Sequence, residues 1–169
     1  MKEVLPLINH ELVDKAVIQI GEENCPDVVD AIIDFLKNKK IRRAKDSGNE
    51  TFEKVAAKYG GGYFQQLRPA KIENIFQTPL ERLRALIKND DIVIIYGVRD
   101  LNRITKSTRG HYFIGVKKDG VLHLFDGQSG EYLELGSTRS SEYINFIRSK
   151  FNKEFKSEEG GGFRFLIVR

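Results

Sequence analysis

Two apolar runs separated by a short turn form the clearest pattern in the chain. Residues 112–116 and 121–125 are rich in apolar side chains, and Asp119-Gly120 lies between them. An Asp-Gly pair suits the two positive-φ positions of a type I′ turn, which joins neighbouring antiparallel strands. The pattern therefore predicts a β-hairpin with a two-residue turn.

The register of this hairpin decides which polar side chains share a face. If the two residues that flank the turn face each other, His111 lies opposite Gln128 and diagonally across from Asp126. Side chains alternate along a strand, so these three project to the same face, and the carboxylate can orient the imidazole. His123 falls on the other face. This placement disfavours an RNA nuclease built on two histidines.

Residues 21–40 predict an amphipathic helix with a cysteine at its start. Apolar residues recur at helical spacing, and Pro26-Asp27 suits the first turn. Cys25 is then expected at or beside the N-cap, where unpaired backbone N–H groups and the helix dipole stabilise a thiolate and can contribute an oxyanion hole. Cys25 is the only cysteine, which excludes an intrachain disulfide and a cysteine-based zinc cluster.

The rest of the pattern predicts further helices and strands around these two elements. Helices are expected at residues 51–59, 78–87, behind a capping box that starts at Thr78, and 140–151. Strands are expected at residues 63–67, 92–96, 133–135 and 163–168, and residues 4–20 are expected to form a short helix or strand. No repeat or linker divides the chain. The sequence therefore predicts one α+β domain, residues 1–169, with helices packed on an antiparallel sheet.

Composition adds few constraints. The chain has 169 residues, of which 40% are hydrophobic and 31% charged, as is usual for a globular protein. Lys and Arg exceed Asp and Glu by 28 to 24, and the charges are interspersed, which argues against a nucleic-acid partner. No apolar run reaches the about 20 residues that span a bilayer, and the N-terminal residues lack the pattern of a signal peptide. No membrane partner is expected.

A basic stretch precedes His111. Arg99, Arg103 and Arg109 lie in this stretch, which is predicted to form a lid or recognition loop at the site. Such a loop could steer an acidic partner toward the site, or its charges could simply keep the loop soluble.

Cysteine at the start of a helix, histidine at the start of a strand and an acid at the end of the next strand give the Cys-His-Asp order of papain-like enzymes. The motifs that carry this order are Asn24-Cys25, Ile94-Ile95-Tyr96-Gly97-Val98-Arg99, Gly110-His111 and Phe125-Asp126-Gly127-Gln128-Ser129-Gly130. Together, over about residues 24–130, they resemble the papain-fold toxin family of toxin glutamine deamidases, which are C-terminal modules of bacterial polymorphic toxins. Members of that family often carry a second cysteine at the position of Val28.

The resemblance implies a papain-like fold and a thiol enzyme that deamidates a glutamine side chain of a target protein. In that reading Cys25 is the nucleophile, His111 is the general base and then acid, and Asp126 fixes the imidazole tautomer. No cofactor and no metal is implied. The resemblance also implies delivery from a producing bacterium as part of a larger polypeptide, action in the cytosol of a target cell, and a cognate immunity protein.

Three questions stay open at the level of sequence. The Gln128 side chain could hold substrate, support the oxyanion hole or cap the turn. Asn24 and Gln19 are both candidates for a further oxyanion donor. The same triad would also serve a cysteine protease or a peptidoglycan amidase, and a catalytically silent domain could act as a binding module.

Overall fold

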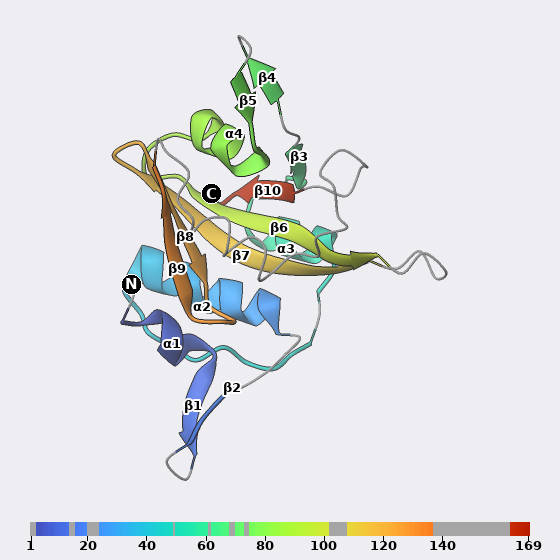
Figure 1. Cartoon of the computed structure of the whole chain (residues 1–169). Coiled ribbons are helices and arrows are strands. Elements are labelled where there is room, and N and C mark those ends of the chain that lie inside the picture. Colours follow the sequence, from blue (N-terminus) through green and yellow to red (C-terminus); the bar gives the residue numbers. More distant parts are fainter. Residues whose placement is uncertain are drawn as a thin grey trace.

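A six-stranded antiparallel sheet forms the centre of the fold. The computed structural model describes residues 3–13, 16–19, 24–48, 50–60, 62–67, 70–72, 75–101, 108–136 and 163–169. The strands lie in the order β3-β10-β6-β7-β8-β9, and each neighbouring pair is antiparallel (Figure 1). Their bounds are β3 (Gln65–Leu67), β6 (Ile92–Leu101), β7 (Thr108–Lys118), β8 (Val121–Asp126), β9 (Glu131–Leu135) and β10 (Phe163–Ile167).

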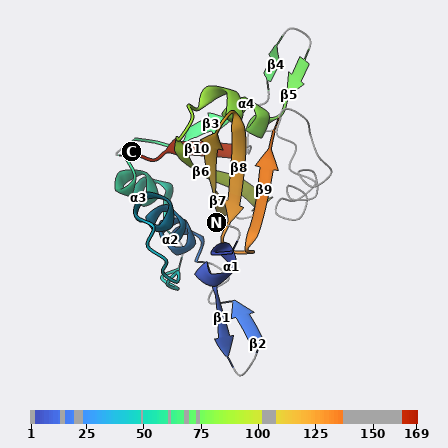
Figure 2. The same cartoon turned by 90° about the vertical axis from the view of Figure 1, so that its left-hand side faces the viewer.

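Within the described part of the chain, four helices and two small hairpins accompany the sheet. The helices are α1 (Leu5–Ile8), α2 (Cys25–Asn38), α3 (Phe52–Lys58) and α4 (Pro79–Leu86). The hairpins are β1 (His10–Val13) with β2 (Ala16–Gln19), and β4 (Ala70–Ile72) with β5 (Ile75–Gln77). Figures 1 and 2 show these hairpins projecting from opposite ends of the molecule. The fold is therefore α+β, as predicted.

Each face of the sheet has its own hydrophobic cluster. On the face covered by α2, Ile32 of that helix packs in one cluster with Ile94 (Figure 2). Leu83 of α4 packs in a second cluster with Ile95. Ile94 and Ile95 are neighbours on β6 and are both fully buried, so this strand is covered on both faces. The predicted central strand is confirmed.

The β7–β8 hairpin has the predicted register. Lys118 pairs with Val121, and the same pairing continues to Ile114 opposite Phe125. Asp119 and Gly120 have φ values of 50° and 79°, as the predicted type of turn requires.

The helix boundaries follow from local capping. Thr78 accepts a hydrogen bond from the backbone N–H of Glu81, whose carboxylate accepts one from the backbone N–H of Thr78, so the predicted capping box is present. Thr51 caps α3 in a similar way. The long helix α2 ends at Lys39, which has a left-handed conformation and donates its N–H to the carbonyl of Phe35.

The structure differs from the predicted elements in two places. Residues 4–20 contain a single helical turn followed by the β1–β2 hairpin, rather than one element. The sequence did not predict the β4–β5 hairpin, whose three-residue strands are too short to show an alternating pattern. The predicted helix at residues 140–151 lies outside the described residues. No helix in the described ranges combines the length and hydropathy needed to cross a membrane.

We predict that Gly110→Ala destabilises the fold just before His111. The ring of Tyr96 lies across Gly110, and a Cβ there would come within 1.9 Å of Tyr96 Cζ. Because this ring is buried between sheet and helices, the clash is expected to lower the free energy of unfolding by about 1–3 kcal/mol, measured by urea denaturation. Gly136→Ala is the matched control, since its Cβ meets nothing within 4 Å. Equal effects of the two substitutions would contradict the steric explanation.

Candidate active site

Cys25 is the first residue of the long helix that packs on the sheet. Asn24 is the N-cap, and its carbonyl accepts the first helical hydrogen bond, from Val28 N–H at 3.1 Å. Pro26 occupies the next helical position, where its missing N–H leaves no hydrogen bond unmade. The predicted position of the thiol is confirmed. Its side chain is buried, with 5% of the residue exposed.

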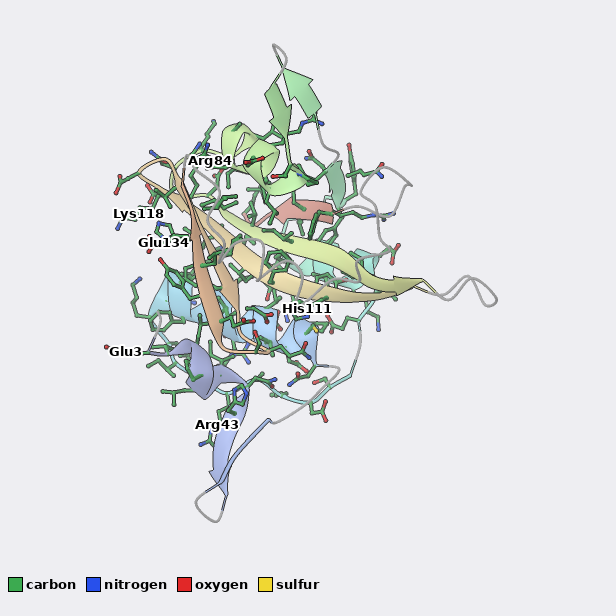
Figure 3. The ribbon with its side chains drawn as sticks, in the orientation of Figure 1. Glu3, Arg43, Arg84, His111, Lys118 and Glu134 are labelled. Atoms are coloured by element: carbon green, nitrogen blue, oxygen red, sulfur yellow. The ribbon has the colours of Figure 1, made fainter. Side chains whose placement is uncertain are left out.

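His111 and Asp126 meet the thiol from two neighbouring strands. Cys25 Sγ lies 3.4 Å from Nδ1 of His111, and Nε2 of the same imidazole lies 2.8 Å from Oδ2 of Asp126. Both His111 and Asp126 are fully buried. Figure 3 shows His111 beside one end of α2. The structure thus brings together the three side chains that the sequence places on separate elements.

These three side chains lie where the two hydrophobic clusters of the fold meet. Cys25 belongs to the cluster under α2. The His111 ring stacks on Phe113, two residues along β7, with ring centroids 6.3 Å apart. Phe113 belongs to the opposite cluster, together with Leu122 and Leu124. His111 therefore shares a face with these residues, as the hairpin register predicts.

The turn after β8 holds the carboxylate in place. Oδ1 of Asp126 accepts hydrogen bonds from the backbone N–H groups of Gln128 and Ser129, at 3.0 and 3.3 Å. A Cβ on Gly127 would come within 2.6 Å of Val28 Cγ1, so the turn packs directly against α2. The helix and the turn therefore fix the distance between the thiol and the carboxylate.

The charges around His111 favour its imidazolium form. Burial by itself would lower the pKa of His111, because it removes water from the charged ring. The hydrogen bond and negative charge of Asp126, with a further contribution from the Cys25 thiolate, outweigh burial, and the pKa of His111 lies above its ordinary value. Because the attraction is mutual, the imidazolium in turn stabilises the thiolate. When the ring is neutral and Asp126 accepts its Nε2–H, Nδ1 is the acceptor that faces the thiol.

Gln128 also contacts the sulfur, which the sequence did not indicate. The Cys25 thiol donates a hydrogen bond to Oε1 of Gln128, at 3.3 Å. A half-turn of the carboxamide would present its NH₂ to the sulfur, where it would donate to a thiolate. The carboxylate of Asp126, rather than the side chain of Gln128, accepts the backbone hydrogen bonds of the turn.

The other two oxyanion candidates are placed differently. Asn24 is fully buried, and its Nδ2 donates to Oδ1 of Asn9 at 2.7 Å and to the carbonyl of Lys45 at 2.9 Å. Both of its N–H groups are thus engaged, and its Oδ1 has no partner among the described residues. An oxyanion needs donors, so Asn24 in this arrangement acts as an anchor for the chain around the site. Gln19 ends β2 opposite His10, and its side chain is outside the described part.

Two of the three arginines of the predicted lid lie at the ends of two long strands. Arg99 is in β6 and Arg109 is in β7. The pairing of these strands continues to Leu101 opposite Thr108, with a register shift between Val98 and Asp100. Arg103 lies outside the described residues, so the lid stays a prediction.

Among the described residues, no group of three or more His, Cys, Asp or Glu side chains is placed to hold a metal ion. No protein-family model, no curated protein and no solved structure matches the chain. Function must therefore be inferred from the geometry of the site and from the motifs in the sequence.

We predict that Cys25 reacts as a thiolate at neutral pH. The rate of alkylation by iodoacetamide, measured across pH, should give an apparent pKa below the unperturbed value of about 8.5. His111→Ala should raise this pKa, because it removes the cation that stabilises the thiolate. Asp126→Asn should raise it by less, because it lowers the pKa of His111 and so depletes the imidazolium.

His123→Ala is the matched control for this titration. His123 is on the other face of β8, where its Nδ1 lies 2.7 Å from the hydroxyl of Tyr132. Its loss should leave the alkylation profile unchanged. A thiol that titrates normally in the wild type and ignores His111 would show that the three side chains do not act as a unit.

Proposed function

We propose that the protein is a papain-like thiol enzyme that deamidates a glutamine side chain of a target protein. The observation that carries the proposal is the contact of one imidazole with both a helix-terminal thiol and a buried carboxylate. The order of these residues along the chain and the motifs around them agree with the toxin glutamine deamidase family. Cys25 is the nucleophile, His111 is the general base and acid, and Asp126 orients the ring.

The reaction follows from these groups. The Cys25 thiolate attacks the carboxamide carbon of the substrate glutamine, and a C–S bond forms as the carbonyl oxygen becomes an oxyanion. The His111 imidazolium gives its proton to the amide nitrogen, and the C–N bond breaks. Ammonia departs, and a glutamyl thioester remains on Cys25. His111 then takes a proton from water, the resulting hydroxide attacks the thioester, and the C–S bond breaks to release glutamate.

The burial of the thiol favours a side-chain amide over a main-chain amide. Cys25 and Gln128 are each only 5% exposed, and His111 is fully buried. A glutamine side chain can reach a recessed thiol end-on, because its carboxamide is at the tip of two methylenes. A peptide bond must be presented with polypeptide on both sides of it. A cysteine protease or a peptidoglycan amidase with the same residues is therefore the second candidate.

The biological setting of the proposal comes from the family resemblance alone. It comprises release from a producing bacterium within a larger polypeptide, action in the cytosol of a target cell and inhibition by a cognate immunity protein. Such a protein would need to cover the site or hold substrate away from it.

We predict that the protein converts glutamine to glutamate in a protein of a cell lysate. The lysate is incubated with the enzyme in heavy-oxygen water, and peptides are then compared by mass spectrometry. Each modified residue should gain the mass of one deamidation with one heavy oxygen, in an uncut polypeptide. Cys25→Ala should abolish this product, whereas His123→Ala should retain it.

Other products would identify the alternatives. New peptide termini carrying heavy oxygen would show a protease. Release of peptide from purified cell wall, with no change in lysate proteins, would show a peptidoglycan amidase. A toxic effect that Cys25→Ala retains would favour a binding module.

We further predict that the Gln128 carboxamide assists turnover more than it assists formation of the thiolate. Its position beside the sulfur suits a donor to the oxyanion, so Gln128→Ala should lower kcat about 100-fold or more. The apparent pKa for alkylation should change little. Gln128→Glu should instead raise that pKa, because it places a second negative charge beside the thiolate. If Gln128→Ala changed only the KM, the side chain would hold substrate rather than stabilise the oxyanion.

A further inference from the structure

A dense basic stretch follows the helix that carries the thiol. Residues 37–45, here called the basic segment, contain six basic side chains and no acidic one. They are Lys37, Lys39, Lys40, Arg42, Arg43 and Lys45. Charges elsewhere in the chain are interspersed, and Lys37, in the last turn of α2, suits the negative end of the helix dipole. The arrangement of the folded chain gives the segment a second role.

The positive charge of the whole chain depends on this segment. Removing its six side chains from the 28 Lys and Arg leaves 22 basic residues against 24 acidic ones. The rest of the protein is therefore slightly acidic, and the basic segment is a local positive feature on it. A concentrated charge of this kind steers and holds a ligand of opposite sign better than the same charge spread over the surface.

The basic segment leads from one end of α2 back toward the end that carries the thiol. The N–H of Ala44 donates to the carbonyl of Ile8, and the carbonyl of Lys45 accepts from the side chain of Asn24, directly before the nucleophile. Just beyond the segment, the N–H of Ser47 donates to the carboxylate of Asp27 in the first turn of α2 at 2.8 Å. The segment is thus fixed to the fold beside the candidate active site.

Several of the basic groups, exposed ones included, also interact within the protein. Arg42 pairs with Asp34, and Lys37 donates to the carbonyl of Arg169. The side chains of Lys40, Arg43 and Lys45 are exposed. Ile41 among them is 55% exposed. The segment therefore offers a row of cations around one apolar side chain.

We propose that the basic segment docks an acidic surface of the protein substrate and so brings its glutamine to Cys25. The link to turnover rests on the function proposed above, whereas the docking itself rests on charge and placement. A protein ligand fits better than a nucleic acid for two reasons. The segment has no aromatic side chain on which bases could stack, and the function proposed above gives the neighbouring thiol an amide substrate. The exposed isoleucine suits the mixed acidic and apolar surface of a protein.

The test is binding of fluorescent poly-L-glutamate, followed by anisotropy at several salt concentrations. The wild-type protein should bind, and its affinity should fall as salt screens the charges. Lys40→Glu/Arg43→Glu should weaken binding about tenfold or more at low salt. Lys88→Glu/Lys118→Glu is the matched control, with the same change in net charge at two exposed lysines. Figure 3 shows Lys118 well apart from Arg43, at the β7–β8 turn. The control should keep near wild-type affinity.

Several results would overturn the docking proposal. They are an absence of poly-L-glutamate binding by the wild type, an equal loss of affinity in the control, and tighter binding of a thymidine oligonucleotide or of phosphatidylserine vesicles than of poly-L-glutamate. Alkylation of Cys25, measured on the same samples, separates this proposal from the previous one. If the wild-type protein did not bind poly-L-glutamate although its Cys25 reacted normally, docking alone would be contradicted. Normal binding with an unreactive thiol would contradict the proposed chemistry alone.

Discussion

The buried contact between His111 and Asp126 is the interaction on which the rest of the site depends. Both side chains are fully buried, and a charge in such a place is tolerated only when it is paired and hydrogen-bonded. Asp126 meets this requirement with the imidazole on one oxygen and two backbone N–H groups on the other. The imidazole is paired in the same way, with the carboxylate at one ring nitrogen and the thiol at the other. Each group therefore constrains the position of its neighbour.

The surrounding fold supplies this constraint through close backbone packing. At Gly127 the turn after β8 approaches α2 so closely that a Cβ would meet Val28. At Gly110 the strand that carries His111 lies directly under the ring of Tyr96. Asn24 anchors the start of α2 to two other segments of the chain. Thiol, imidazole and carboxylate are thus held by three elements that touch one another, and the packing of the chain itself sets their relative positions.

The same packing relates recognition to chemistry. The thiol is recessed where the two hydrophobic clusters meet, so little of it is exposed to a ligand. An exposed cationic stretch can select a partner at longer range, because electrostatic attraction acts before contact. The hydrogen bond between Asn24 and the carbonyl of Lys45 joins the two features within a few residues. Under the proposed function, specificity would come from the surface around the site, because a thiol, an imidazole and a carboxylate are shared by many thiol enzymes.

Local signals in the sequence predicted a large part of this arrangement. The Asp119-Gly120 turn and the alternation of the strands set the register of the hairpin, and with it the shared face of His111 and Asp126. A capping box placed the start of α4, and Pro26-Asp27 in the first turn placed the start of α2 and with it the position of Cys25. These features depend on neighbours a few residues apart, which is why the sequence shows them.

The tertiary structure alone decided how these elements meet. The contact of Gln128 with the sulfur, the anchoring of Asn24 by Asn9 and Lys45, and the return of the basic segment along α2 join residues far apart in the chain. The pairing of β10 with both β3 and β6 is of the same kind. Such contacts arise from packing across the whole fold, and no local pattern of hydrophobic and polar residues specifies them.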